Sequence, residues 1–185
     1  MFKKVLIANR GEIAVRIARA VQQLGMCAVA VYSQADAQAY HISVADEAYA
    51  LEGPTPSAGY LDVPQLIQIA QTAQVQAVHP GYGFLSENAI FAQACLQAGL
   101  VFIGPTPAVI EQMGNKIIAK QIMQQAGVPI LPSWQGDITD IKVVLSQADA
   151  IGYPVLVKAA AGGGGKGMRL VYESHQLAEA IQSAA

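Results

Sequence analysis

A run of glycines near the carboxyl end of the chain has the composition of a phosphate-binding loop. Residues 162–165 are four consecutive glycines, and Lys166 separates them from Gly167. Each glycine adds backbone entropy that folding must overcome, about 0.5–1 kcal/mol relative to alanine, so five within six positions are costly for an ordinary turn. Backbone N–H groups that carry no side chains can approach a polyphosphate closely. The run therefore predicts a flap that covers a polyphosphate ligand.

Two better-known glycine motifs do not fit this run. The spacing Gly162-x-Gly164-x-x-Gly167 matches the dinucleotide-binding fingerprint in its letters. That motif opens a helix, however, whereas residues 168–172 alternate as a strand does. The run also resembles the end of a P-loop, but Gly167 stands where Ser or Thr must meet Mg²⁺. The sequence is better described as a strand, a glycine flap and a second strand.

Lys158 lies near the end of the strand that precedes the flap. A lysine among valines and leucines either faces solvent or is kept for a charged partner. Beside a glycine flap the second interpretation is favoured, because phosphate oxygens would give its ammonium group a charged hydrogen bond worth about 1.5–3 kcal/mol. This arrangement resembles the lid of ATP-grasp enzymes, which close two antiparallel-sheet domains over ATP.

The elements before this lid alternate between apolar strands and amphipathic helices. Continuous apolar runs predict strands that are buried on both faces, and apolar residues at helical spacing predict the helices between them. The expected elements are strand 3–8, helix 13–24, strands 27–32 and 48–51, helix 61–73, strand 76–79, helix 88–98 and strand 100–103. Strands separated by helices imply a parallel sheet with right-handed crossovers. The fold class is α/β, with a Rossmann-like sheet (the pre-ATP-grasp domain) first.

The organisation changes after Gly104-Pro105. The expected elements are then helices 107–113 and 115–125, helix 138–150, strands 154–159 and 168–172, and a helix from residue 174. We expect a Rossmann-like domain over 1–114, a helical linker over 115–129, and part of an α+β ATP-grasp lid subdomain over 130–185. The last expected helix has no cap at Ala185, which we interpret as a truncation.

Two further segments lie where parallel strands end. The first is Ile7–Ala14 (IANRGEIA), and the second is His79–Asn88 (HPGYGFLSEN). Sheets of α/β proteins place ligands at the carboxyl ends of their strands. A purely structural interpretation is also open, in which Asn9 and Gly11 form a turn, Glu12 favours the helix N-terminus and Ser86 caps the next helix.

Taken together, these segments resemble the biotin carboxylase family, which includes parts of the acetyl-CoA, pyruvate, propionyl-CoA and methylcrotonyl-CoA carboxylases. The resemblance extends over 113–116, 126–129 and 152–154, and so over the whole chain. It implies ATP-dependent activation of bicarbonate to carboxyphosphate, followed by carboxylation of biotin on a carrier protein. Carbamoyl-phosphate synthetase and the purine-pathway ATP-grasp enzymes share the fold but not these runs.

The resemblance also implies roles for individual residues. It assigns five of them to ATP: Lys116, Lys158, Gly164, Gly165 and Met168. Tyr82 and Glu87 would face the bicarbonate–biotin region. The alternative for Lys116 is an ordinary exposed helix lysine. In the family, the Mg²⁺ ligands, the catalytic glutamate and the bicarbonate-binding lysine and arginines come from a later ATP-grasp domain, so we expect this chain alone to be inactive.

The implied partners are a biotin carboxyl carrier protein or domain and a carboxyltransferase. Arg16 and Arg19 lie one turn apart on one helix face, and in bacterial relatives that helix helps to form a homodimer. Gln23 replaces a glutamate often seen there, so an ordinary solvated helix face is the alternative to a dimer surface. In the flap, Ala161 stands where relatives often have a fifth glycine, and Lys166 stands where arginine is common. Both flap changes are mild, because either cation suits a phosphate.

Composition excludes several other classes. A net charge of −2 gives no basic field for nucleic acid or an anionic membrane surface. No window approaches the roughly 20 apolar residues of a membrane span, and the amino terminus lacks a secretory signal. Cys27 and Cys95 are expected to be buried, unpaired residues of a reducing compartment, which favours the cytoplasm.

Two other functions compete with the ligase. One is a stand-alone nucleotide-binding or scaffold module without catalysis. The other, a nicotinamide oxidoreductase, is disfavoured because no glycine fingerprint follows the first strand. His41, His79 and His175 have no metal-like spacing, and His79, which precedes Pro80, is expected to bond to the backbone. The sequence does not identify the final carboxyl acceptor.

Overall fold

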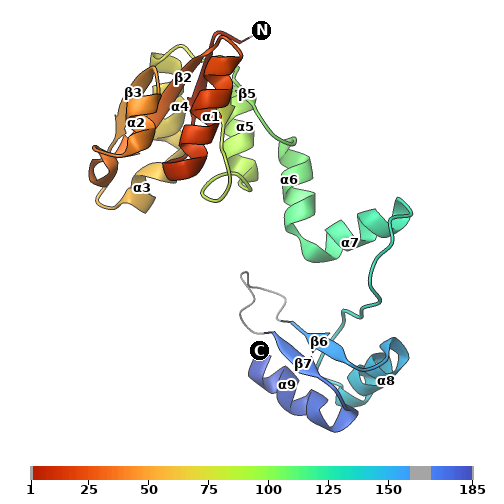
Figure 1. Cartoon of the computed structure of the whole chain (residues 1–185). Helices are drawn as coiled ribbons and strands as arrows, with labels where there is room; N and C mark the ends of the chain where they lie inside the picture. Colours follow the sequence, from red (N-terminus) through yellow and green to blue (C-terminus); the bar gives the residue numbers. More distant parts are fainter. Residues whose placement is uncertain (1, 159–167, 185) are drawn as a thin grey trace. The chain divides into compact units, whose positions relative to one another are not determined.

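The structure is a computed structural model that describes residues 2–158 and 168–184 (Figure 1). The chain forms two compact units, Met1–Ala119 and Lys120–Ala185, which are described separately. The boundary between the units lies within the helix α7 (Lys116–Gln125).

The first unit is built on a parallel sheet. Its strands are β1 (Lys4–Ile7), β2 (Cys27–Ser33), β3 (Glu47–Leu51), β4 (Ala77–His79) and β5 (Val101–Phe102). Their order across the sheet is β3-β2-β1-β4-β5, and every neighbouring pair is parallel. The helices of the unit are α1 (Gly11–Gln23), α2 (Tyr40–Val44), α3 (Pro56–Tyr60), α4 (Val63–Thr72), α5 (Ala89–Gln97) and α6 (Pro107–Gly114). The expected Rossmann-like α/β fold is confirmed.

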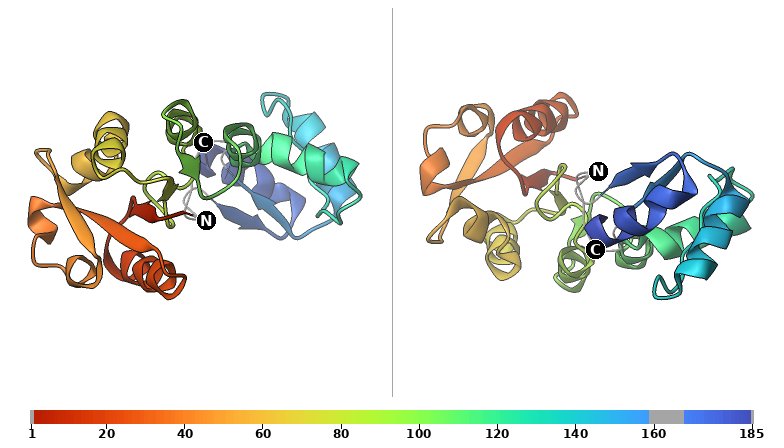
Figure 2. Two further views of the ribbon diagram at one scale, coloured as in Figure 1. Left: turned by 90° about the horizontal axis from the view of Figure 1, so that it is seen from above. Right: turned by 90° about the horizontal axis from the view of Figure 1, so that it is seen from below.

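Helices cover both faces of this sheet (Figure 2). Helices α1 and α2 pack on the face that presents Val5 and Ile7, whereas α3, α4 and α5 pack on the face of Leu6 and Val29. The side chains at 5, 6 and 7 are fully buried. The continuous apolar run of β1 therefore reports burial on both faces, as parallel sheets require.

The helix expected at 13–24 is α1, and its buried face does not include Leu24. The helix buries Ala14, Ile17, Ala18 and Val21, whereas Leu24 is 59% exposed. Leu24 follows the last helical turn, where the chain reverses direction through Gly25 at φ +73°. Such a left-handed backbone at a helix end is favourable for glycine, and the helix ends within one residue of the expected position 24.

The second unit packs two helices on a small antiparallel sheet. After the first unit ends within α7, the chain forms α8 (Ile141–Ile151), β6 (Val155–Val157), β7 (Arg169–Val171) and α9 (Leu177–Ala184). Short 3-10 turns, η1 (Gln34–Asp36) in the first unit and η2 (Ser174–Gln176) in the second, complete the described elements. Val171 is buried between the sheet and the helices, together with Val144, Ala148 and Leu177. This small α+β unit agrees with the expected lid subdomain.

Among the described residues, no helix is long and apolar enough to cross a membrane.

Candidate functional site

The two motif segments meet at the carboxyl edge of the first unit's sheet. Strands β1 and β4 are direct neighbours, with Ile7 in register with His79. Asn9 follows β1 and is only 3% exposed. Its amide nitrogen donates to the carbonyl oxygens of Pro80 at 2.7 Å and Tyr82 at 2.8 Å, and its Oδ1 accepts from the Arg10 backbone N–H at 2.9 Å. Asn9 thus holds the second motif segment against the first.

The backbone of the second segment is shaped to fit this contact. Gly81 has φ +67°, and a Cβ added there would lie 2.7 Å from Nδ2 of Asn9. The Gly81 N–H donates to Nδ1 of His79 at 3.0 Å, so that nitrogen is the unprotonated acceptor. Burial lowers the pKa of His79, which favours the same neutral ring. The expectation that His79 bonds to the backbone is confirmed.

Tyr82 and Glu87 lie on this segment and are both exposed. The Tyr82 hydroxyl donates to Oε2 of Glu12, at the start of α1, at 2.8 Å. This hydrogen bond to a carboxylate raises the pKa of Tyr82. Glu87 lies one residue before Asn88, whose side chain accepts from the Phe91 N–H and caps α5. In the purely structural interpretation Ser86 would cap this helix; the structure gives that role to Asn88 instead.

A partly buried polar network supports the same edge, and the motifs did not predict it. Tyr60 is fully buried, and its ring stacks on Phe84 with centroids 5.1 Å apart. Its hydroxyl donates to Asp36, which also pairs with Arg10 at 2.9 Å. Burial alone would raise the pKa of Asp36, but hydrogen bonds from Arg10, Tyr60 and Ser33 hold that pKa below its ordinary value. Tyr60 lies between the expected strand 48–51 and the expected helix 61–73, where no element was expected, so no sequence pattern indicated it.

In the second unit, Lys158 and Met168 lie at the ends of the two paired strands that residues 159–167 connect in sequence. Lys158 follows β6 directly and Met168 precedes β7 directly, and both are exposed. The register pairs Leu156 with Leu170. Because side chains alternate across a strand, Lys158 shares a face with Leu156. This pair of leucines, 47% and 53% exposed, lies on the face opposite to buried Val171.

The hairpin therefore presents one face that is apolar yet uncovered within its own unit. We call it the hairpin face and define it by Leu156, Lys158, Met168 and Leu170. The two leucines were not predicted as site residues. The alternation of Val155-Leu156-Val157-Lys158 is the pattern that could have identified Leu156, because it places the leucine and the lysine on one side of the strand.

The remaining ATP-assigned residues are placed as follows. Lys116 is exposed at the first position of α7, and the side chain of Asn115 caps this helix by accepting from the N–H groups of Ile117 and Ile118. Gly164 and Gly165 lie outside the described residues. The roles assigned to these three residues stay predictions.

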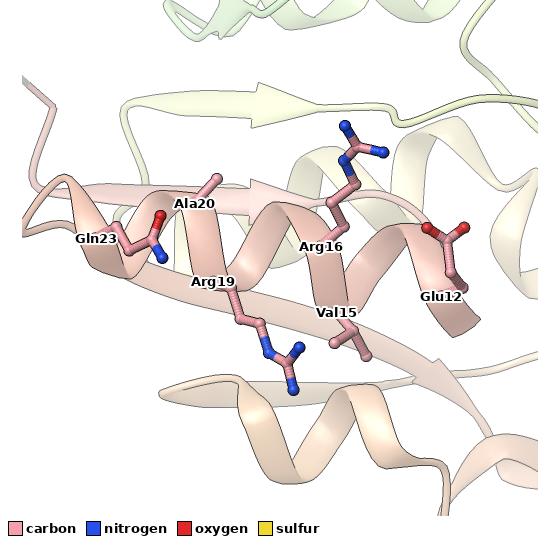
Figure 3. A pocket seen from close by; sticks show the side chains of 6 residues that line it. All are labelled: Glu12, Val15, Arg16, Arg19, Ala20 and Gln23. Carbon is pink, nitrogen blue, oxygen red and sulfur yellow. The ribbon is translucent and has the colours of Figure 1, made fainter.

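The exposed face of α1 forms a shallow hollow (Figure 3). It is lined by Glu12, Val15, Arg16, Arg19, Ala20 and Gln23. Both guanidinium groups extend away from the helix axis, and Arg19 donates to the Tyr40 hydroxyl at 3.1 Å. The expectation that Arg16 and Arg19 share an exposed face is confirmed. Because Glu12 also binds Tyr82, this hollow adjoins the second motif segment.

Within the described parts of the chain, no group of three His, Cys, Asp or Glu side chains could hold a metal ion. Both cysteines are free. Cys95 is buried, as expected, and burial raises its pKa to about 11. Cys27 is only partly buried, which corrects the expectation for that residue, since its sulfur lies beside the carboxylate of Glu47 at the sheet's surface.

Comparison with known families gives two matches along the chain. Residues 1–110 match the family described as "Biotin carboxylase, N-terminal domain". Residues 115–185 match the family described as "Carbamoyl-phosphate synthase L chain, ATP binding domain". The two matches divide the chain near the start of α7.

Individual relatives match nearly all of the chain. A biotin carboxylase of Halalkalibacterium halodurans is 52% identical over 181 residues, which are 98% of this chain and 40% of that protein. Biotin carboxylase 1 of Bacillus subtilis is 48% identical over 182 residues, which are 98% of this chain and 40% of that protein. The chain thus spans about two fifths of the length of these curated relatives.

Solved structures agree with these relatives. A biotin carboxylase from Campylobacter jejuni in complex with β-γ-ATP has a TM-score of 0.89 at 43% identity, over 100% of this chain and 41% of that one. The biotin carboxylase domain dimer of 2-oxoglutarate carboxylase from Hydrogenobacter thermophilus has a TM-score of 0.87 at 45% identity, over 100% and 40%. That structure contains MgADP, ADP and bicarbonate.

Proposed function

The chain belongs to the biotin carboxylase family, and we propose that it forms the amino-terminal part of an ATP-dependent ligase that carboxylates biotin. In this reaction ATP activates bicarbonate to carboxyphosphate, and a ureido nitrogen of biotin on a carrier protein then receives the carboxyl group. The observation on which the proposal mainly depends is the hairpin face, where Lys158 stands beside exposed apolar side chains next to the glycine run.

The hairpin face has the chemistry of a nucleotide site. The apolar surface of Leu156, Leu170 and Met168 suits a purine ring, because covering it removes apolar area from water. Lys158 supplies a positive charge for the phosphates on the same face. Lys116 and the flap residues Gly164 and Gly165 complete the proposed ATP set. The related C. jejuni structure, which is a complex with β-γ-ATP, supports this assignment.

The edge of the first unit has the properties of a substrate-orienting site. Tyr82 and Glu87 are exposed, yet the backbone that carries them is held by Asn9, His79 and the hydrogen bond to Glu12. Fixing reactive groups in this way is a large part of what an enzyme contributes. We place Tyr82 and Glu87 at the bicarbonate–biotin region.

The chemistry at Mg²⁺ and bicarbonate is assigned to the part of the relatives that this chain does not match. We propose, as the family resemblance implies, that the Mg²⁺ ligands, the catalytic glutamate and the bicarbonate-binding cations come from that part. When bound, Mg²⁺ would neutralise charge on the phosphates of ATP. This chain's own residues would bind the nucleotide and orient the second substrate.

The proposed partners follow from the same reaction. A biotin carboxyl carrier protein presents the biotin, and a carboxyltransferase takes the carboxyl group onward. The hollow on α1 is proposed as a homodimer surface, an assignment supported by the dimer of the related H. thermophilus domain. The free thiols of Cys27 and Cys95 support a reducing compartment such as the cytoplasm.

A chimaera tests the proposed function. This chain replaces the matching 181 residues of the H. halodurans biotin carboxylase, to which it is 52% identical. We expect ATP hydrolysis that depends on both bicarbonate and biotin, and no such turnover from the 185-residue chain alone. A folded chimaera without biotin-dependent hydrolysis would instead favour the alternative, a nucleotide-binding or scaffold module.

A further inference from the structure

Arg10 and Phe84, one from each motif segment, are connected through residues that belong to neither. The Arg10 guanidinium pairs with Asp36 through both carboxylate oxygens, at 2.9 and 3.0 Å. Asp36 accepts from the Tyr60 hydroxyl at 2.9 Å, and the Tyr60 ring stacks on Phe84. The chain of contacts therefore runs from the first segment to the second by a route separate from that of Asn9.

Phe84 needs such support because of its backbone. Its φ is +40°, a left-handed conformation that is unfavourable for a bulky side chain. Strained residues persist where their surroundings over-determine them. The neighbouring ring of Tyr60 lies 5.1 Å away at an interplanar angle of 23°, an offset-stacked geometry. This contact holds the Phe84 side chain in place while its backbone makes the unusual turn.

Tyr60 is itself fixed in position. Its ring is fully buried, and its hydroxyl oxygen also accepts from the backbone N–H of Ser33 at 3.3 Å. The Ser33 hydroxyl donates to Asp36 at 3.0 Å, so the carboxylate is held by three side chains. The Arg10 guanidinium carbon lies 5.9 Å from the centroid of the Tyr60 ring. A buried aromatic ring with a fully bonded hydroxyl is a rigid support.

We propose that Tyr60 is a positioning residue, which through its stack on Phe84 fixes the segment 80–88 and so the exposed Tyr82 and Glu87. The structural part of this inference depends only on the contacts above. Its consequence for substrate binding rests on the proposed function, so each part needs its own measurement.

Amide hydrogen exchange of the 185-residue chain tests the structural part. The stack, at about 0.5–1.5 kcal/mol, corresponds to exchange that is about 2- to 12-fold faster at 80–88 in Tyr60→Leu. Phe84→Leu, at a side chain 38% exposed, should give the same local change without emptying the core. Tyr60→Phe keeps the stacked ring and loses only the hydroxyl bonds, so its exchange at 80–88 should be slower than that of Tyr60→Leu. Unchanged exchange at 80–88 in both leucine variants would overturn the proposal.

A core control separates local from global effects. Val21→Ala removes buried volume on the opposite face of the sheet, so we expect it to lower overall protection without a selective change at 80–88. If Phe84→Leu instead accelerates exchange equally throughout the first unit, Tyr60 supports the core in general and the proposal is wrong.

Kinetics of the chimaera test the functional part. Tyr60→Leu should raise KM for bicarbonate and for biotin about 2- to 12-fold and leave KM for ATP unchanged, because the nucleotide is assigned to other residues. Tyr60→Phe, which keeps the stacked ring, should raise these KM values less than Tyr60→Leu does. An inactive unsubstituted chimaera contradicts the proposed function and leaves the exchange result standing. An active chimaera whose KM values do not respond to Tyr60→Leu overturns the positioning role.

Discussion

The side-chain amide of Asn9 donates a hydrogen bond to the carbonyl oxygen of Tyr82 at 2.8 Å, across 73 residues of sequence. A second donation from the same nitrogen goes to Pro80 at 2.7 Å. One buried side chain thereby satisfies two carbonyl groups of a segment that forms no regular secondary structure of its own. The relation explains why the two motif segments lie together at one edge of the sheet: the first segment supplies the contact that holds the second.

Removing this amide should destabilise the first unit. Asn9→Ala leaves the carbonyls of Pro80 and Tyr82 without their donor, and unsatisfied buried groups cost about 1–3 kcal/mol in the free energy of unfolding. Urea denaturation of the 185-residue chain measures this difference. Gln93→Ala, at an exposed position of α5, is the control and should stay within about 0.5 kcal/mol. Equal stability of both variants would show that the amide bonds contribute nothing.

Two glycines of the same segment form a matched pair. Gly81 and Gly83 have nearly equal φ values, +67° and +66°. A Cβ at Gly81 would meet Asn9 at 2.7 Å, whereas a Cβ at Gly83 has nothing within 4 Å. Gly83→Ala should therefore cost about 1–2 kcal/mol of unfolding free energy from backbone strain alone. Gly81→Ala should cost more unfolding free energy than Gly83→Ala in the same denaturation experiment. A reversed order would contradict the close contact between Gly81 and Asn9.

Stability should fall as the pH drops below the ordinary histidine pKa. Burial lowers the pKa of His79 from 6.5 in the folded chain, so below about pH 6.5 the unfolded state binds more protons than the folded state. The slope from this residue is at most about 1.4 kcal/mol per pH unit, until the pH passes the folded pKa as well.

Two asparagine variants test whether His79 causes this pH dependence of the unfolding free energy. His79→Asn keeps an acceptor near the Nδ1 position and removes the titration, so the unfolding free energy should lose that share of its pH dependence. His175→Asn changes an exposed histidine of the second unit. In this variant the unfolding free energy should retain its full pH dependence. A His79→Asn variant with an unaltered slope between about pH 5 and 6.5 would exclude His79 as its source.

The α1 hollow predicts a charge-sensitive dimer of the chimaera. Arg16→Glu together with Arg19→Glu reverses two charges on the exposed face without touching the buried residues of α1. We expect a shift toward monomer in sedimentation velocity, with secondary structure unchanged by circular dichroism. Lys142→Glu, on α8 of the second unit, is the control for a change of net charge. If the double variant and the control sediment alike, the hollow is not the interface.

The sequence predicted the sheet well, because its strands are apolar runs buried on both faces. The strand of residues 3–8 appears as β1 at Lys4–Ile7, and the expected helix at 115–125 appears as α7 at Lys116–Gln125. Shorter elements were missed. Helix α3 (Pro56–Tyr60) lies between the expected strand 48–51 and helix 61–73, where no helix was expected, and it begins after Thr55, whose side chain caps it.

The site was predictable only where a motif marked it. The segments at 7–14 and 79–88 were identified and do meet at one edge. The supports behind them were not, since Asp36 and Tyr60 come from distant parts of the chain and are brought together only by the fold. Leu156 and Leu170 were not predicted as site residues for a related reason. The sequence shows that they are apolar, but only the packing of α8 and α9 shows that their face is left exposed.

Replacing Lys158 tests the central claim, that the hairpin face binds the phosphates of ATP, most directly. In the chimaera, loss of a charged hydrogen bond of about 1.5–3 kcal/mol should lower kcat/KM for ATP roughly 10- to 150-fold in Lys158→Ala. Lys142→Ala, at an exposed lysine of the same unit, should keep kcat/KM for ATP within about 2-fold of the unsubstituted chimaera. An unchanged kcat/KM for ATP in Lys158→Ala would contradict the account.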